Sequence, residues 1–211
     1  MYRVVEMFRS MQGEGFLSGT PAVFVRFAGC NRACDFCDTP NRDTVALEFN
    51  TSHALACEVW DLCTDGADIN LVVLTGGEPT LQVDAALLES LRECIPGVRI
   101  QIETNGEAEL DPYLIDDLEC NCWLTWSPKQ ATVLPVFRVD EVKVLWPPPW
   151  GGDPEDVIGS WLRPDTPLML QPTADQDGSL DPEVLRKATR WLVGHPGWRL
   201  SVQLHKLFNW R

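Results

Sequence analysis

Short apolar segments alternate with segments of helical periodicity along most of this 211-residue chain. The segments with strand-like patterns are Val4–Met7, Ala22–Phe27, Asn70–Leu74, Val98–Glu103, Trp123–Trp126, Glu141–Leu145, Leu168–Gln171 and Leu200–Leu204. Helices are predicted at Ser52–Asp61, Val83–Cys94, Pro112–Leu118, Pro154–Trp161 and Pro182–His195. Alternation of this kind favours an α/β fold with a mostly parallel sheet, and we expect one domain over residues 1–211.

Polar residues cluster where these predicted strands end. In parallel α/β barrels the active site lies at the carboxyl ends of the strands, so the pattern predicts a functional rim there. The alternative interpretation is that strand ends meet solvent and are polar for that reason alone. The residues concerned are Thr75, Glu78, Glu103, Asn105, Ser127, Lys129, Lys143, Gln171, Gln203 and His205.

The charge balance bears on the class of partner. The formal net charge is −14, from 31 acidic and 17 basic residues, and such a field repels a phosphate backbone. We therefore expect a small-molecule substrate and no nucleic acid. No apolar run reaches the roughly 18 residues that span a bilayer, and the N-terminus does not resemble a signal peptide. The expectation is a cytoplasmic protein without a membrane partner.

Three of the eight cysteines, Cys30, Cys34 and Cys37, form a CxxxCxxC motif just after the predicted strand Ala22–Phe27. Three thiolates can hold a 4Fe–4S cluster and leave one iron open. S-adenosylmethionine (SAM) can chelate that iron. One electron from the reduced cluster then cleaves SAM, which leaves a 5′-deoxyadenosyl radical. The alternatives are a disulfide or a zinc site to which His53 and Cys57 could contribute. The other five cysteines are interpreted as small buried hydrophobes: Cys57, Cys63, Cys94, Cys120 and Cys122.

Two motifs resemble the radical SAM superfamily. The first is the CxxxCxxC motif with Phe36 before its last cysteine, and the second is Thr75-Gly76-Gly77-Glu78-Pro79. The second motif is similar to the GGEP motif, which in that superfamily contacts the methionyl amino group of SAM. The resemblance implies an abbreviated, partial TIM-like barrel of the radical SAM type.

A narrower resemblance covers nearly the whole chain and points to the 7-carboxy-7-deazaguanine synthase family. The segments that match in order are 6–15, 24–31, 37–39, 103–106, 127–129, 141–143, 170–172 and 203–206. That family converts 6-carboxy-5,6,7,8-tetrahydropterin to 7-carboxy-7-deazaguanine on the path to queuosine and other 7-deazapurines. The resemblance implies a homodimer that uses SAM, a 4Fe–4S cluster, Mg²⁺ and a reductant such as flavodoxin.

The resemblance also implies roles for individual residues. Thr39 would bind Mg²⁺ together with the substrate carboxylate. Residues expected to hold SAM are Phe36, Asp38, Gly77, Glu78, Glu103, Ser127, Pro128, Lys129 and Gln171. Residues expected to line the substrate are Met11, Gln12, Gly13, Glu14, Arg26, Thr75, His205 and Arg211. The chain departs from the family in its last five residues, Leu207 to Arg211, which differ from the usual Pro- or Ala-ended tails.

Physical chemistry allows these roles and leaves alternatives open. Arg26 and a metal ion can counter a substrate carboxylate inside an acidic protein, although such an arginine is often a surface ion-pair residue. Lys129 can equally be a solvated loop lysine, and His205 can equally cap the last strand. Two rival functions remain, an activase that installs a glycyl radical on a partner protein and a non-catalytic iron–sulfur or zinc module. Under the favoured hypothesis, hydrogen abstraction at carbon 6 starts a ring contraction that ends with loss of ammonia.

Overall fold

The structure is a computed structural model that describes residues 1–37, 39, 43–110, 112–131, 138–174 and 179–209. One sheet runs through the described chain in the order β3-β1-β2-β4-β5-β6-β7-β8-β9. From β2 to β9 all neighbouring strands are parallel, while β1 is antiparallel to both β2 and β3. The strands are β1 Tyr2–Met11, β2 Pro21–Phe27, β3 Leu47–Phe49, β4 Leu71–Gly76, β5 Arg99–Thr104, β6 Cys122–Trp126, β7 Glu141–Trp146, β8 Leu168–Pro172 and β9 Trp198–Leu200.

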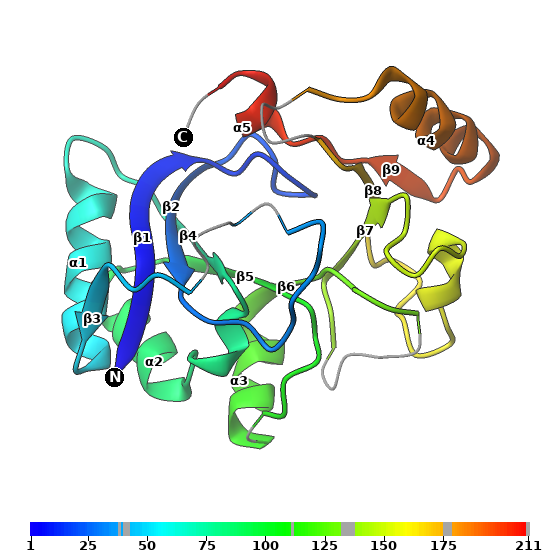
Figure 1. Cartoon of the computed structure of the whole chain (residues 1–211). Helices are drawn as coiled ribbons and strands as arrows, with labels where there is room; N and C mark the ends of the chain where they lie inside the picture. Colours follow the sequence, from blue (N-terminus) through cyan, green and yellow to red (C-terminus); the bar gives the residue numbers. More distant parts are fainter. Residues whose placement is uncertain (38, 40–42, 111, 132–137, 175–178, 210–211) are drawn as a thin grey trace.

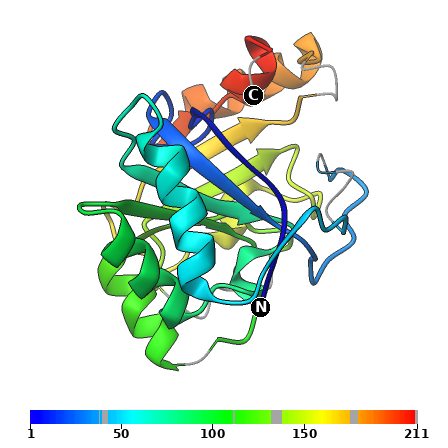
Figure 2. The same ribbon diagram turned by 90° about the vertical axis from the view of Figure 1, so that its left-hand side faces the viewer.

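The sheet curves without closing, because β3 and β9 form its two edges among the described residues (Figure 1). Helices α1, α2 and α3 lie along its outer side, and α4 lies near β8 and β9 (Figures 1 and 2). The prediction of an α/β fold with a mostly parallel sheet is confirmed. The helices are α1 Ser52–Thr64, α2 Ala85–Cys94, α3 Pro112–Asn121, α4 Pro182–Gly194 and α5 Leu204–Leu207, with 3₁₀ turns η1 Pro79–Leu81 and η2 Pro154–Val157.

Strands β5 and β7 each have one apolar face and one polar face. In β5, Ile100 and Ile102 are buried in the main core, which also takes in the inner faces of the helices. Gln101 alternates with them and is buried on the other face of the sheet. In β7, Val142 lies in the same core, and Lys143 next to it points to the opposite face and is almost completely buried. Hydrophobic stabilisation therefore comes mainly from the helix-covered side, and the inner side carries polar groups.

Side-chain caps fix where two of the outer helices begin. The Thr51 hydroxyl accepts a hydrogen bond from the Ala54 amide at the start of α1. Asp84 accepts from the Leu87 amide at the start of α2 and also from the Tyr2 hydroxyl, at 2.7 Å. The second contact ties α2 to β1. No helix in the part of the chain that the structure describes is long and apolar enough to cross a membrane.

Two predicted elements were wrong in extent. The expected helix Pro154–Trp161 is only the short turn η2, because Asp153 and Asp156 close a capping box and the chain is extended again at Ile158. The last strand ends at Leu200, and residues 204–207 form α5. The short edge strand β3 was not predicted. His205 therefore lies on a helix rather than at a strand end.

Candidate active site

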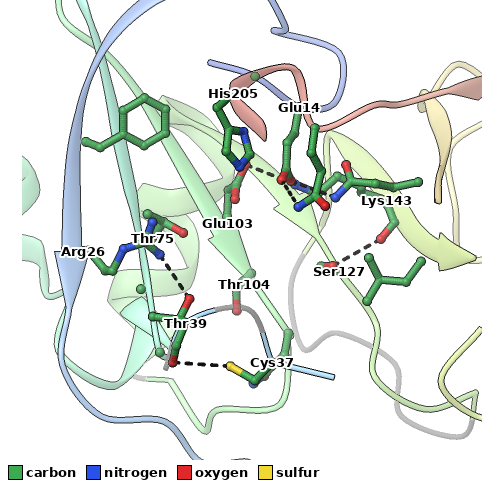
Figure 3. Close-up of a pocket in the computed structure, with 18 of the residues that line it drawn as sticks. Glu14, Arg26, Cys37, Thr39, Thr75, Glu103, Thr104, Ser127, Lys143 and His205 are labelled. Atoms are coloured by element: carbon green, nitrogen blue, oxygen red, sulfur yellow. Dashed lines mark hydrogen bonds and ion pairs between the residues drawn. The ribbon is translucent and has the colours of Figure 1, made fainter. Parts of the chain in front are cut away.

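A cavity of about 410 Å³ lies on the inner face of the sheet, toward the carboxyl ends of the parallel strands (Figure 3). Its walls come from β1, β2, the segment 30–37 with Thr39, the ends of β4 to β8 and the residues after β9. Polar groups from segments far apart in sequence therefore meet in one space.

The cysteine loop begins at Gly29, whose φ of +86° turns the chain out of the end of β2. None of Cys30, Cys34 and Cys37 forms a disulfide, and all three line the cavity. A turn links two of them, since the amide of Cys37 donates to the carbonyl oxygen of Cys34 at 3.2 Å. The three thiols can therefore serve together as ligands, and a disulfide between any of them is not formed.

Side chains from the segment after β5 hold this loop in place. Asn105 donates its side-chain amide to Asn31 Oδ1 at 2.7 Å. Arg32 Nη1 donates to both carboxylate oxygens of Glu107, at 2.9 and 2.8 Å. Both contacts connect the cysteine loop to the part of the chain that follows Glu103. The position of the thiols is thus coupled to the neighbouring strand end.

The glycine motif packs directly against the cysteine loop. A Cβ atom on Gly77 would lie 1.9 Å from the carbonyl oxygen of Gly29, and one on Gly76 would lie 2.3 Å from that of Phe27. The Glu78 amide donates to the Gly29 carbonyl oxygen at 2.9 Å. Glycine is therefore required because the two backbones touch. The two sequence motifs form a single structural unit.

Glu78 organises the donors around it. Its Oε1 accepts hydrogen bonds from the Thr80 amide, the Thr80 hydroxyl and, at 2.6 Å, the Thr104 hydroxyl. Its Oε2 accepts from the Asn105 amide at 2.8 Å. A carboxylate oxygen has two lone pairs, so among the described contacts Oε2 has capacity for one more donor. The side chain is nearly fully buried and braces the ends of β4 and β5.

An ion-pair network lies deeper in the cavity. Lys143 Nζ is 2.6 Å from Glu14 Oε2 and 3.2 Å from Glu103 Oε1. Glu14 also accepts hydrogen bonds from Gln171 at 3.0 Å and from Gln203 at 2.8 Å. One cation therefore pairs with two carboxylates, and the further hydrogen bonds of Glu14 offset part of the cost of its burial.

Burial and charge act in opposite directions on these groups. Burial alone would raise the pKa of Glu14, but the charge and hydrogen bond of Lys143, together with Gln203 and His205, outweigh burial and hold that pKa well below its usual range. Burial would lower the pKa of Lys143, yet Glu103 and Glu14 raise it far above normal. Glu141 differs, because burial raises its pKa despite the nearby lysine. At neutral pH the Glu14–Lys143 pair is ionised on both sides.

Arg26 and Thr75 lie side by side at the other end of the cavity, on neighbouring strands (Figure 3). Arg26 Nε is 2.9 Å from Glu6 Oε1, and its Nη1 donates to the Thr39 hydroxyl at 3.4 Å. Cys37 Sγ is 3.8 Å from the carbonyl oxygen of Thr39. Arg26 was expected to be either a substrate ligand or an ion-pair residue. It makes an ion pair and also faces the cavity, so both interpretations hold in part.

The ends of β6 and β8 complete the opposite wall. Lys129 Nζ donates to the Ser127 hydroxyl at 3.0 Å, and that hydroxyl donates to the Lys143 carbonyl oxygen at 3.3 Å. Gln171 contacts both Glu14 and Ser201, whose hydroxyl donates to Gln171 Oε1 at 2.7 Å. Lys129 is thus directed to the cavity rather than standing alone in a loop.

The first and last segments of the chain meet at the rim. The Leu204 amide donates to the carbonyl oxygen of Gly13 at 3.0 Å, which places α5 against the segment after β1. A Cβ atom on Gly13 would lie 2.7 Å from His205 Nδ1. His205 is on α5 and lines the cavity next to Glu14 (Figure 3), so the idea that it caps the last strand was wrong.

Most of the predicted site residues line this one cavity. Pro128 is buried but does not line it, and Asp38 and Arg211 lie outside the described residues. His53 and Cys57 sit on α1 and do not line it, so they are not partners of the three thiols. The predicted residues that line it are Met11, Gln12, Gly13, Glu14, Arg26, Cys30, Cys34, Phe36, Cys37, Thr39, Thr75, Gly77, Glu78, Glu103, Ser127, Lys129, Gln171 and His205.

Sequence reasoning missed Gln101 and Thr125, two buried polar residues beneath the cavity that continue a chain of hydrogen bonds from the predicted Gln12. Gln12 Nε2 donates to Gln101 Oε1 at 2.8 Å, and Gln101 Nε2 donates to the Thr125 hydroxyl at 3.0 Å. Thr125 in turn donates to Glu141 at 3.1 Å. Gln101 could have been found from the strict polar–apolar alternation of residues 99–103, which places it on the same face as Glu103; residues 141–144 show the same alternation.

Comparisons with known proteins decide the family. A model of the radical SAM superfamily matches residues 24–119. The 7-carboxy-7-deazaguanine synthase of Bacteroides thetaiotaomicron is 38% identical over 211 residues, which is 100% of both chains. That of Nitratidesulfovibrio vulgaris is 36% identical and covers 97% of each chain. The chain belongs to the 7-carboxy-7-deazaguanine synthase family.

Solved structures agree with this family assignment. QueE from Escherichia coli has 27% sequence identity and a TM-score of 0.68, covering 97% of this chain and 94% of that one. SuiB from Streptococcus suis, solved bound to S-adenosylmethionine, has 13% identity and a TM-score of 0.54 over 82% of this chain and 44% of that one, which shows the fold alone. The predicted partial barrel of the radical SAM type is confirmed.

As a member of the 7-carboxy-7-deazaguanine synthase family, the chain is a radical SAM enzyme of deazapurine biosynthesis. The superfamily implies a 4Fe–4S cluster and SAM as cofactors. Activation of a glycyl-radical enzyme is not favoured, because the full-length relatives carry the synthase name.

Proposed function

We propose that the chain converts 6-carboxy-5,6,7,8-tetrahydropterin to 7-carboxy-7-deazaguanine, with ring contraction and loss of ammonia. One observation carries the proposal: three cysteines outside any disulfide, Arg26 and the ionised Glu14 surround a single cavity in a chain that matches the synthases over its full length. The cavity volume, about 410 Å³, lies in the usual range for small-molecule sites, roughly 300–1,000 Å³.

The donor set fits the implied iron–sulfur cluster. Three cysteines that form no disulfide line one cavity, and a 4Fe–4S cluster held by three thiolates keeps one iron open. When bound, the cluster supplies that open iron for SAM and the electron that cleaves SAM to a 5′-deoxyadenosyl radical. Cys30, Cys34 and Cys37 would hold the cluster, and the contacts of Asn31 and Arg32 would fix their loop.

The residues proposed to hold SAM come from four strand ends. Gly77 lets the backbone approach the cysteine loop closely, and Glu78 keeps capacity for one donor at Oε2, which suits the amino group of SAM. Lys129 supplies positive charge for the SAM carboxylate. On the family resemblance alone, we also assign SAM binding to Phe36, Asp38, Glu103, Ser127, Pro128 and Gln171.

The substrate would bind between Arg26 and Glu14. Arg26 has five N–H donors, of which the contacts with Glu6 and Thr39 use two, so it can also take the pterin carboxylate. Glu14 stays ionised beside Lys143 and accepts hydrogen bonds, which suits the N–H groups of a pterin ring. The remaining residues proposed to line the substrate are Met11, Gln12, Gly13, Thr75, His205 and Arg211.

Mg²⁺ is proposed to bind at Thr39 together with the substrate carboxylate. The Thr39 hydroxyl is the hard oxygen donor that Mg²⁺ prefers, and the ion usually keeps several waters. Because Arg26 lies 3.4 Å from that hydroxyl, the anionic substrate would be needed to balance two neighbouring positive charges. Metal and substrate binding should therefore depend on each other.

We further propose a homodimer that receives electrons from a reductant such as flavodoxin and does not bind nucleic acid. The net charge of −14 supports the last point. The residues around the cavity would orient the substrate and exclude water and oxygen from the reaction.

The test is anaerobic reconstitution with iron and sulfide, followed by incubation with SAM, reductant, Mg²⁺ and 6-carboxytetrahydropterin. We expect 7-carboxy-7-deazaguanine by mass spectrometry, and none from Cys34→Ala. Arg26→Lys keeps the positive charge but loses the planar guanidinium, whose paired N–H donors fit a carboxylate. It should raise KM for the pterin more than it lowers kcat. Cleavage of SAM without any consumption of the pterin would contradict the proposed substrate.

A further inference from the structure

A second group of metal-binding side chains lies on the outer helices. Cys57 is exposed, so its interpretation as a buried hydrophobe was wrong. It follows His53 by one turn of α1, and Cys94 comes from the end of α2. Cys57 Sγ is 3.5 Å from His53 Nε2, and Cys94 Sγ is 3.8 Å from His53 Nδ1. One ligand atom from each residue lies within 4.8 Å of the other two.

These separations are close to those around a tetrahedral ion. Zinc–sulfur bonds of about 2.3 Å and zinc–nitrogen bonds of about 2.0–2.1 Å put neighbouring ligand atoms roughly 3.5–3.8 Å apart. A single ion binds only one of the two imidazole nitrogens. The thiol that lies beside the other nitrogen therefore has to rotate toward the ion. His53 and Cys57 are both exposed, and their side chains can rotate with little disturbance of the core.

The backbone under these ligands is well supported. Leu55 and Val59 on α1, and Leu88 and Leu91 on α2, are fully or almost fully buried in the main core. Ligands on two packed helices are held more firmly than ligands on loops. Residues four apart on a helix also project from one face, as in helical zinc-binding motifs.

The chemistry of the three side chains selects a class of ion. Two thiols and one imidazole suit a borderline-soft divalent cation such as Zn²⁺, whereas Mg²⁺ prefers oxygen ligands. A set of three protein ligands leaves a fourth position for water. None of the three lines the active-site cavity, so an ion here would be separate from the cysteine loop.

We propose that His53, Cys57 and Cys94 form a second metal site that binds one Zn²⁺ ion. The ion would connect the first two turns of α1 to the last turn of α2. This site is independent of the substrate assignment, because it lies outside the cavity and needs neither SAM nor the pterin.

The direct test measures zinc on the full-length protein after reconstitution of its iron–sulfur cluster, under reducing conditions that prevent disulfides. Wild type should bind one zinc per chain in addition to the cluster iron. His53→Ala and Cys57→Ser, both at exposed positions, should each lower zinc affinity by at least about tenfold. Cys122→Ser is the matched control, since it removes a thiol outside the group and should keep the zinc. Equal zinc affinity in wild type and Cys57→Ser would overturn the proposal.

Cobalt provides a second readout that reports the ligand type. With Cys30, Cys34 and Cys37 all replaced by alanine, Co²⁺ should still give a thiolate-to-cobalt charge-transfer band, weaker in Cys57→Ser. Disappearance of the band in the triple-alanine protein would show that the metal belongs to the cysteine loop and would overturn the second site. In the reconstituted enzyme, His53→Ala should cleave SAM at the wild-type rate. A parallel loss of SAM cleavage would equally contradict a separate site.

Discussion

Lys143 Nζ lies 2.6 Å from Glu14 Oε2, although the two residues are 129 positions apart in the sequence. The side chain of Lys143 is only 4% exposed and that of Glu14 15% exposed, so water screens the pair weakly. The pair joins the segment after β1 to β7 across the inner face of the sheet. Its strength should therefore be visible in both stability and substrate binding.

Replacing Lys143 with methionine should destabilise the protein strongly. The change leaves Glu14 and Glu103 buried without their cation, and breaking a buried pair in this way costs about 3–5 kcal/mol. Urea unfolding of Lys143→Met against wild type measures the loss in the free energy of unfolding. The double variant Lys143→Met with Glu14→Gln should recover part of it, because one uncompensated charge is removed. Additive losses in the double variant would contradict the coupling.

Acid should weaken the fold through Glu14. Its pKa is lowered in the folded state, so its contribution to stability is present above the ordinary glutamate pKa of about 4.3 and is lost as pH falls toward the folded-state value. Urea midpoints measured from pH 6 downward should fall more steeply in wild type than in Glu14→Gln. Parallel curves for the two proteins would show that Glu14 does not titrate with unfolding.

Gly77→Ala should disrupt the contact between the glycine motif and the cysteine loop. The new Cβ would meet the Gly29 carbonyl oxygen, so one of the two backbones must move. We expect iron incorporation and SAM cleavage to fall by at least about tenfold. Gly197→Ala is the control, because a Cβ there meets nothing within 4 Å, and it should reconstitute normally. Normal iron content in Gly77→Ala would count against the required close approach.

Glu78→Gln should affect stability as well as SAM binding. The amide replaces one acceptor oxygen with a donor that faces the hydroxyls of Thr80 and Thr104 or the amide of Asn105. An unsatisfied buried hydrogen-bonding group costs about 1–3 kcal/mol. Thermal unfolding gives the stability change, and equilibrium dialysis with SAM gives the affinity. Unchanged thermal stability would show that the carboxylate is not needed to brace these strand ends.

The sequence predicted the parallel sheet well because its strands carry period-two or continuous apolar patterns that do not depend on distant residues. It also predicted the cavity rim, since polar residues at parallel strand ends must gather on one edge. It could not reveal that Lys143 pairs with Glu14 or that Glu78 braces Thr104, because such contacts depend on the curvature of the sheet. The α5 helix was missed because four residues give too short a periodic signal.

The contact between the first and last parts of the sequence has a consequence for biosynthesis. The backbone of Leu204 binds that of Gly13, and Gln203 contacts Glu14 across 189 positions. During translation, one wall of the cavity is missing until residues 203–205 have left the ribosome. The compartment for radical chemistry is therefore completed only after residues 203–205 have emerged and packed against Gly13 and Glu14.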